Sequence, residues 1–433
     1  MSNRFRSMPL MALSAVLGGA LVTVAVPAVA KEKPKKEEAR KGTTIAASKG
    51  FGPSVKKMMD AANAKDAAAL QTALTEGQGS ASTNEDRYWL AFYQLQLGLL
   101  KSDKALQGQG LDAMIDSGIT PPESVATYNF FSGNFAYGDK NYTKAIQRLE
   151  AAKAAGSTEA NLPLLLADSY LSAGQIDQGV ATAKAAIEAS RAAGQRPSEE
   201  LYVRPARALQ AANRTDEMLD FLALRLKDYG TPQAWRQTLY IALQQSGSDK
   251  DISLDTLRLM RATNSMTERP EYLEYASLAT EAALPGEAVG VIKAGKAKKV
   301  IPDGDAAMNE MLKAQTERIG DEESTLTAYA ARPATLSNPK VAGATGDAMV
   351  SYGRYADAVP LYKAAVAAGG DKELWTYRMG VAQALAGDAA GAKASLGQVT
   401  GKRKRLASLW LVKIDGATAA PATATAAAAP AGS

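Results

Sequence analysis

Apolar residues between about residues 51 and 414 recur in stretches of 12–17 residues that are rich in Ala and Leu. Each stretch is broken by Gly, Asn, Asp or Pro, which are the residues that end helices and form turns. No segment of this region alternates apolar and polar residues as a half-buried strand does. The pattern therefore predicts an all-α body built from short helices.

A period of 34 residues runs through this body. Small or medium apolar residues stand twelve, then four, then three positions apart, and the same spacing returns further along the chain. The clear copies are Gly133, Ala145, Leu149 and Ala152; Ala167, Gly179, Ala183 and Ala186; Gly346, Ala358, Tyr362 and Ala365; and Gly380, Ala392, Leu396 and Val399. Weaker copies begin at Ala206, Leu239, Ala276 and Leu312.

This spacing has a physical cause. Two antiparallel helices of a hairpin approach closely only where a side chain is small, so Gly or Ala marks each contact. The turn between the two helices favours Gly or Asn, which adopt the left-handed conformation at low cost. The residues expected at these turns are Gly174, Asn213, Gly353 and Gly387.

The pattern resembles the tetratricopeptide repeat family. The segments that carry the resemblance are SGNFAYGDKNYTKAI, LADSYLSAGQIDQGV and TGDAMVSYGRYADAV, and the best matches cover residues 126–194 and 339–400. The resemblance implies an α-α superhelix of about ten antiparallel helix pairs over residues 51–414. An apolar helix around residues 403–414 is expected to cap the last pair, because the end of such a stack otherwise exposes its core.

The first 30 residues resemble a secretory signal peptide. Arg4 and Arg6 precede an uncharged apolar run, and Pro27-Ala28-Val29-Ala30 provides the small residues that a signal peptidase reads. We therefore expect cleavage after Ala30 and a periplasmic location. Together with the resemblance to the tetratricopeptide repeat family, this predicts an exported bacterial member of that family. The alternative is an uncleaved anchor, and membrane contact is expected only in that case.

The two segments that flank the body have compositions typical of disorder. Residues 31–50 mix Lys, Glu, Pro and Gly and are predicted to form a charged linker, and residues 415–433 form an Ala/Pro/Thr-rich tail. The leader contributes two positive charges and residues 31–41 a further three, so they account for the whole net charge of +5. Because the rest of the chain is neutral, no nucleic-acid partner is expected.

The chain has no Cys and no His. This excludes disulfides, thiolate nucleophiles, zinc fingers and every mechanism that needs a histidine base. We expect no enzyme activity, no cofactor, no metal and no small-molecule substrate.

Several short motifs imitate chemical sites and are better explained by helix packing. They are the phosphate-loop-like GVIKAGKA at residues 290–297, Gly108-Gln109-Gly110, the Ser54–Lys57 pair, and the Glu-Ser pairs at 123–124 and 323–324. The basic run Lys402-Arg403-Lys404-Arg405 either binds an anionic polymer or forms the solvated face of the capping helix, and the second interpretation is preferred.

Proteins that resemble this family use the face formed by their first helices to hold a partner. The residues expected to line such a groove here are Thr127, Phe130, Asn134, Tyr137, Asn161, Leu164, Asp168, Leu171, Arg207 and Gln210. Asp168 disfavours a clamp for a C-terminal carboxylate, because the two charges would repel. The alternative interpretation of these residues is ordinary solvated surface.

The leading hypothesis is a non-catalytic periplasmic scaffold that binds another envelope protein or a peptide segment. Such a scaffold serves the assembly of a cell-envelope, secretion or polysaccharide-export complex. The alternative is a peptidoglycan-associated accessory protein that acts with glycan-processing enzymes.

Overall fold

The computed structural model describes residues 45–319 and 322–419, and all regular elements in these ranges are helices, α2 to α23. The predicted signal peptide, most of the predicted linker and most of the predicted tail lie outside the described residues. The described chain divides into two compact units, residues up to 208 (unit 1) and from 209 on (unit 2). The all-α prediction is confirmed.

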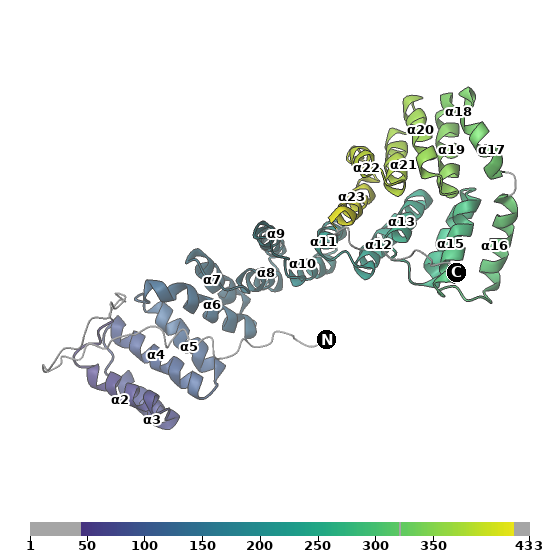
Figure 1. Ribbon diagram of the computed structural model, residues 1–433. Helices are drawn as coiled ribbons and strands as arrows, with labels where there is room; N and C mark the ends of the chain where they lie inside the picture. The colour runs from purple at the N-terminus through teal and green to yellow at the C-terminus, as the bar shows by residue number, and fades with distance from the viewer. Residues whose placement is uncertain (1–44, 320–321, 420–433) are drawn as a thin grey trace, which may run out of the picture. The chain divides into compact units, whose positions relative to one another are not determined.

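Unit 1 is a series of helix pairs in which each helix packs against its neighbours in sequence (Figure 1). Its helices are α2 (Gly52–Asn63), α3 (Ala67–Gln78), α4 (Asn84–Leu100), α5 (Lys104–Asp116), α6 (Pro122–Gly138), α7 (Tyr142–Ala154), α8 (Leu162–Ser172) and α9 (Ile176–Ala192). The boundary between the units falls inside α10 (Glu200–Ala211).

Short polar side chains start several of these helices. Asp66 and Asp103 each accept two hydrogen bonds from backbone N–H groups in the first turn of the following helix. Asn141 does the same for one N–H group of α7. These caps satisfy donors that the helix itself leaves unpaired, so they fix where each hairpin turns.

The close contacts predicted from the 34-residue period are present. A Cβ atom added to Gly133 would lie 2.7 Å from Cγ of Leu149, and one added to Gly380 would lie 2.7 Å from Cγ of Leu396. Gly346 approaches the ring of Tyr362 equally closely, at 2.7 Å. Within each hairpin the glycine therefore makes room for the partner helix.

The predicted turn residues are confirmed as well. Gly174, Asn213, Gly353 and Gly387 all have positive φ angles, from 57° to 86°. Two other repeats, which begin at Gly133 and Ala276, make the same left-handed turn with less suitable residues: Lys140 and Ala283 have φ angles of 60° and 56°. A side chain other than that of Gly or Asn costs about 1–2 kcal/mol in this conformation. A Lys or Ala at such a position therefore gives no sign in the sequence that the chain turns there.

Residues 45–50, which the sequence analysis assigned to the linker, are structured in the described chain. Ile45 is buried, and its carbonyl accepts a hydrogen bond from Nε1 of Trp89 at 3.3 Å. The buried carboxylate of Asp86 accepts hydrogen bonds from the backbone N–H and the hydroxyl of Ser48, at 2.8 and 2.9 Å. Residues 45–50 therefore pack on α4, and only residues before them remain a predicted linker.

Unit 2 contains the helices from α11 onward. They are α11 (Thr215–Asp228), α12 (Pro232–Ser246), α13 (Lys250–Ala262), α14 (Arg269–Glu281), α15 (Pro285–Ala297), α16 (Ala306–Ile319), α17 (Glu322–Ala330), α18 (Pro333–Ser337), α19 (Pro339–Ser351), α20 (Tyr355–Ala367), α21 (Lys372–Leu385), α22 (Ala389–Leu396) and α23 (Lys404–Ala419). The regular pairing is interrupted at α16–α18, where α15 packs directly onto α19.

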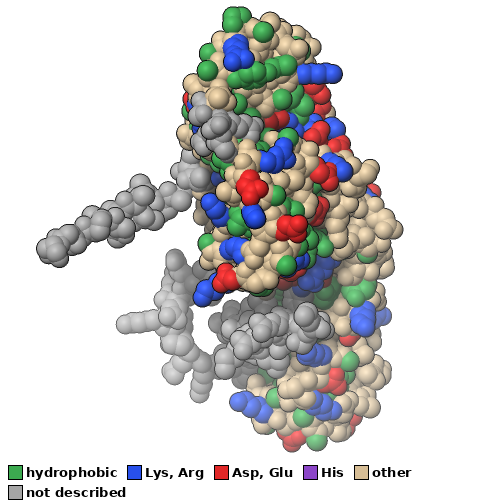
Figure 2. All heavy atoms as spheres, turned by 90° about the vertical axis from the view of Figure 1, so that its right-hand side faces the viewer, with side chains coloured by type: hydrophobic (Ala, Val, Ile, Leu, Met, Phe, Trp, Pro, Cys, Tyr) green, Lys and Arg blue, Asp and Glu red, His purple; other side chains and the backbone are tan. Residues whose placement is uncertain are grey.

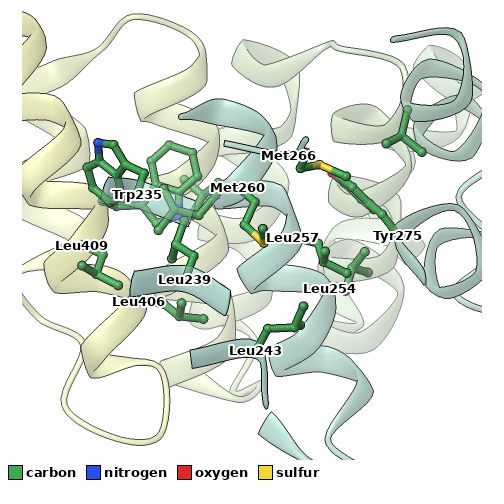
Figure 3. Close-up of a cluster of buried hydrophobic side chains, with 14 of the residues drawn as sticks. Trp235, Leu239, Leu243, Leu254, Leu257, Met260, Met266, Tyr275, Leu406 and Leu409 are labelled. Carbon is green, nitrogen blue, oxygen red and sulfur yellow. The ribbon is translucent and has the colours of Figure 1, made fainter. Parts of the chain in front are cut away.

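The last helix does more than cap the last pair. Besides α21 and α22, α23 contacts α11 and α13, which lie about 150 to 190 residues earlier in the chain. Figure 3 shows Leu406 and Leu409 of α23 beside Leu239 of α12, and all three belong to one buried cluster. Unit 2 is therefore closed on itself by its C-terminal helix.

The prediction that Lys402–Arg405 forms a solvated face of the capping helix is wrong for Arg403, whereas Lys402 and Lys404 are exposed. Arg403 is 2% exposed, and its Nε donates to Oδ2 of Asp255 at 2.8 Å. Lys402 pairs with Asp249 at 2.7 Å and Arg405 with Asp216 at 2.9 Å. The run attaches α23 to helices that are distant in sequence.

A network of buried charges lies at the centre of this closure. We call Asp255, Arg258, Glu287, Asp347, Arg378 and Arg403 the central ion network; all six are at most 9% exposed. Arg258 binds both oxygens of Glu287, at 2.8 and 2.7 Å, and also Asp255 at 3.2 Å. Arg378 donates to Asp347, and the three arginines balance the three acids.

Burial acts differently on two of these acids. Burial raises the pKa of Asp347, and the nearby Arg378 offsets only part of that rise. Burial also opposes ionisation of Glu287, but the guanidinium of Arg258 outweighs it and holds the pKa of Glu287 below its usual value. The bidentate Arg258–Glu287 pair is therefore ionised in the folded unit.

Candidate functional site

The predicted groove residues differ widely in how accessible they are. Asn161, Arg207 and Gln210 are exposed; Thr127, Asn134, Tyr137, Leu164 and Leu171 are half-buried; Phe130 and Asp168 are buried. Nine of the ten lie on α6, α8 and α10, and Asn161 is the N-cap of α8. Gln210 lies beyond the boundary of unit 1, so it is left out of the site below.

Phe130 does not belong to an accessible face. Its ring is 1% exposed and lies in the buried core of unit 1, with the ring of Phe131 5.4 Å away. The prediction failed because α6 has neighbours on two sides: it packs on α5 as well as on α7. An aromatic residue that the repeat pattern assigns to a groove is used here to join two hairpins.

Three side chains connect the first helices of successive pairs. The hydroxyl of Tyr137 on α6 donates a hydrogen bond to Oδ2 of Asp168 on α8. The guanidinium of Arg204 on α10 donates to the same oxygen, and its Nε also binds Glu200 at 2.9 Å. Asp168 therefore joins three successive first helices.

Charge balance changes the interpretation of Asp168. Alone it would repel an anionic partner, but here Arg204 neutralises it. Burial, followed by the hydrogen bond to Asp168, raises the pKa of Tyr137 to about 12, so its hydroxyl remains a donor at neutral pH. Arg204 is not among the predicted groove residues, although its place four residues after Glu200 in the sequence indicates an ion pair on one helix face.

Helical spacing places further groups on the same face. Asn134 precedes Tyr137 by three residues, Leu164 precedes Asp168 by four, and Arg207 follows Arg204 by three. Among the residues that the structure describes, the side chains of Asn134, Asn161 and Arg207 have no hydrogen-bond or ion-pair partner. We call Asn134, Tyr137, Asn161, Leu164, Asp168, Leu171, Arg204 and Arg207, together with Thr127, the first-helix face.

This face offers binding chemistry rather than catalytic chemistry. It combines free amide donors and acceptors, one free guanidinium, and the half-buried apolar side chains of Leu164 and Leu171. Unpaired polar groups beside partly buried apolar ones are what a peptide or a protein helix can use. The described part of the chain contains no cluster of three acidic or other ligating side chains that could hold a metal ion.

The motifs that imitate chemical sites are structural in the folded chain. Gly295 of the phosphate-loop-like segment lies in α15, where a Cβ would come 2.5 Å from Ile301. A Cβ on Gly110 would come 2.7 Å from the backbone N of Leu95, so this glycine lets α5 approach α4. Lys57 forms an exposed ion pair with Glu76 at 2.9 Å. The side chains of the Glu323-Ser324 pair lie outside the described residues.

The surface is mixed in charge. On the face drawn in Figure 2, Lys and Arg side chains lie among Asp and Glu side chains. This agrees with the net charge of zero after residue 41. Among the described residues, no helix combines the length and the apolar character needed to cross a bilayer.

Comparisons of the sequence find neither a matching family model nor a matching curated protein. Comparisons of the structure find helical arrays at low similarity. The Naa15/Naa10 complex bound to HypK-THB matches with a TM-score of 0.33 and 12% identity over 82% of this chain, which spans 63% of that chain's length. The quorum sensor NprR from B. thuringiensis matches with a TM-score of 0.27 and 14% identity, over 73% of this chain and 97% of its own. Yeast Tom70 matches with a TM-score of 0.21 and 9% identity, over 85% of this chain and 96% of its own.

These neighbours are tetratricopeptide-repeat-containing proteins, the family that the sequence pattern resembles. The chain itself is an all-α array of sequential antiparallel helix pairs.

Proposed function

We propose that this protein is a non-catalytic scaffold that binds another protein of the bacterial cell envelope through the first-helix face of unit 1. The observation that supports this best is the chain of contacts from Tyr137 through Asp168 to Arg204. It fixes three successive first helices in register and leaves polar groups around it without partners.

A fixed face binds more tightly than a mobile one. Side chains that are already held by neighbours lose little conformational freedom when a partner arrives, so less of the contact energy is spent on ordering. Asn134, Asn161 and Arg207 can then exchange water for hydrogen bonds to a peptide, while Leu164 and Leu171 provide apolar contact.

The periplasmic location rests on the predicted signal peptide alone. A leader with Arg4 and Arg6, an apolar run and cleavage after Ala30 would deliver the repeat body into the envelope. Assembly of a cell-envelope, secretion or polysaccharide-export complex is the task that fits a scaffold in that compartment. Fractionation of cells tests this directly: the mature protein should begin at Lys31 and be released with the periplasm.

Affinity capture from envelope extracts tests the binding face. The informative variant is Asn134→Ala/Arg207→Ala, because both side chains are accessible and neither holds the fold together. The matched control is Gln147→Ala/Lys153→Ala, which removes one amide and one cation from exposed positions of α7. A specific partner should be lost with the first variant and kept with the second.

An identical set of captured proteins with both variants would contradict the proposal. The peptidoglycan-associated alternative is tested in parallel by sedimentation of the mature protein with the polymer. Three of the four basic side chains that could have bound an anionic polymer, Lys402, Arg403 and Arg405, already form ion pairs with acids of unit 2. Salt-resistant sedimentation would nevertheless overturn the scaffold proposal.

A further inference from the structure

Unit 2 contains a cavity of about 580 Å³ that lies away from the central core. It is bordered by the turn between α14 and α15, by α17, by the residue that caps α18, and by α19. Its size falls within the usual range of about 300–1,000 Å³ for sites that hold small ligands or the side chains of a peptide.

The interruption of the helix pairing produces this cavity. The backbone N–H of Glu287 on α15 donates to the hydroxyl of Ser351 on α19 at 2.8 Å. Gly286 allows this approach, because a Cβ there would lie 2.7 Å from the carbonyl oxygen of Ser351. With α15 placed directly on α19, α17 and α18 pack beside α19 instead of between the two helices.

The floor of the cavity is partly apolar, because it combines aliphatic side chains with buried Thr345 and Asp347. Leu284 and Leu326 are buried and Val341 is half-buried, and all three line it. Tyr329 also lines the cavity but stays 39% exposed. Large apolar side chains that remain exposed beside an apolar cavity mark a surface that can bind a partner.

Two cations border the cavity. Arg332 and Lys340 both line the cavity, both are exposed, and among the described residues neither has an ion-pair partner. The guanidinium of Arg332 lies over the ring of Tyr329, 5.1 Å from its centroid, which limits where it can point. Charge and orientation both suit an anionic group at the mouth.

Among the described residues of the lining, the one acid does not cancel these charges. Asp347 is buried and already paired with Arg378, and it accepts a hydrogen bond from the hydroxyl of Tyr362 at 2.8 Å. Glu281, at the end of α14, pairs with Lys250 at 2.6 Å. As far as its described side chains go, the cavity therefore presents a positively charged mouth above a partly apolar floor.

We propose that this cavity binds an acidic peptide segment of a protein partner, with a carboxylate between Arg332 and Lys340 and a neighbouring aliphatic side chain against Leu284, Leu326 and Val341. A peptide fits better than a small metabolite because Tyr329, which lines the cavity, also stays exposed and offers apolar surface to a longer occupant. This is a second binding site, on a different unit from the first-helix face, and it stands independently of the proposed function.

Fluorescence polarisation of the full chain with a fluorescein-labelled peptide of about ten alternating Glu and Leu residues tests the proposal. Arg332→Ala/Lys340→Ala should weaken binding by about tenfold or more, and affinity should fall with added salt. The matched control is Lys363→Ala/Lys372→Ala, which removes two exposed cations that do not line the cavity. This control should bind as the wild type does.

A second variant protects the test against misfolding. Ala344 lines the cavity and is exposed on α19, so Ala344→Glu should leave the helical circular dichroism unchanged and abolish binding of the acidic peptide. The first-helix variant Asn134→Ala/Arg207→Ala should bind this peptide normally, so the two proposals fail or succeed separately.

Three results would overturn the proposal. Equal binding by the cavity variant and its control would show attraction to net charge alone. Equal binding of a peptide with Gln in place of Glu would remove the role of the cations. Complete displacement by excess free glutamate would identify a small carboxylate, rather than a peptide, as the occupant.

Discussion

Units 1 and 2 are built from the same kind of helix pair but are held together differently. In unit 1, helices pack on neighbours one or two places away in the chain. In unit 2, α23 also packs on α11 and α13, and α15 packs on α19. An array of neighbour contacts loses stability locally, whereas a closed one transmits a local loss through all its helices.

The buried charges divide in the same way. Of the buried acidic and basic side chains in the described residues, unit 1 has Asp86 and Asp168, and unit 2 has Glu271 and the six members of the central ion network. Asp86 accepts hydrogen bonds from backbone and hydroxyl donors that lie no more than 38 residues away in sequence. Arg403, in contrast, pairs with an acid 148 residues away in sequence. Unit 1 therefore has local anchors and unit 2 has long-range ones.

Deleting residues 403–433 should have the largest effect on this contrast. It uncovers the partners of Leu406, Leu409 and Trp410 and leaves Asp255 without Arg403. Each buried apolar side chain contributes about 1.5–3 kcal/mol, so unit 2 should lose its cooperative transition in urea. The control deletes only residues 420–433 and should unfold as the full chain does. If both truncations unfold alike, α23 does not close the unit.

Removing one arginine from the central ion network should destabilise unit 2 less than the deletion does, but still strongly. Arg258→Met leaves Glu287 and Asp255 buried without their shared partner and should destabilise unit 2 by about 3–5 kcal/mol. The comparison is Lys250→Met, which breaks an exposed pair with Glu281 and should cost less than about 1 kcal/mol.

Tryptophan fluorescence separates the two units in this experiment. Trp89 is the one tryptophan before residue 209, and the other three lie in unit 2. The Arg258→Met transition seen by the unit 2 tryptophans should move to lower urea, while the transition of Trp89 should stay in place. A parallel shift of both would show that the units unfold as one.

Two glycine substitutions in α6 should change the stability of unit 1 by smaller amounts and in opposite directions. Gly133→Ala should destabilise unit 1 by about 1–3 kcal/mol, because the new Cβ meets Leu149 at 2.7 Å. Gly138→Ala, in the last turn of the same helix, meets nothing within 4 Å and should stabilise by about 0.4–1 kcal/mol. Thermal unfolding of both variants measures this, and an equal sign for the two would refute the close-packing account.

Acid should loosen the N-terminal anchor of unit 1 by the smallest amount. Burial opposes ionisation of Asp86, but hydrogen bonds from Ser48, Ser82 and Thr83 outweigh it and lower its pKa. A depressed carboxyl pKa contributes stability above the unfolded value of about 3.9, and this contribution is lost as pH falls through the folded value.

The fluorescence of Trp89 reports this anchor, because its indole binds Ile45. Its change on acidification below about pH 4 should disappear in Asp86→Asn, which cannot titrate. An unchanged acid response in the variant would assign it to another carboxyl group.

Short-range features of the fold could be predicted from the sequence. Small residues at a fixed spacing and turn glycines are local requirements, so Gly133, Gly380 and Gly174 could be placed before the structure was known. The left-handed turns at Lys140 and Ala283 could not, because the sequence there carries no residue that prefers the conformation.

Long-range features could not be predicted in this way. The pattern of Lys402–Arg405 is the same whether a basic run faces solvent or an acid 148 residues away, and only the closure of unit 2 decides it. Similarly, Phe130 fits a groove position within its repeat and is buried because of its neighbour α5. The predicted groove residues include Tyr137 and Asp168 but not Arg204. The contact of Arg204 with Asp168 depends on the register between α8 and α10, which the sequence does not show.

Hydrogen exchange of the full chain carrying Arg403→Ala tests the difference between the two units most directly. Closure predicts that amide protection falls together in α11, α13, α21 and α23, while protection in α2 to α7 stays at the wild-type level. An ordinary capping helix would instead fray alone, so a loss of protection confined to α22 and α23 would contradict the account.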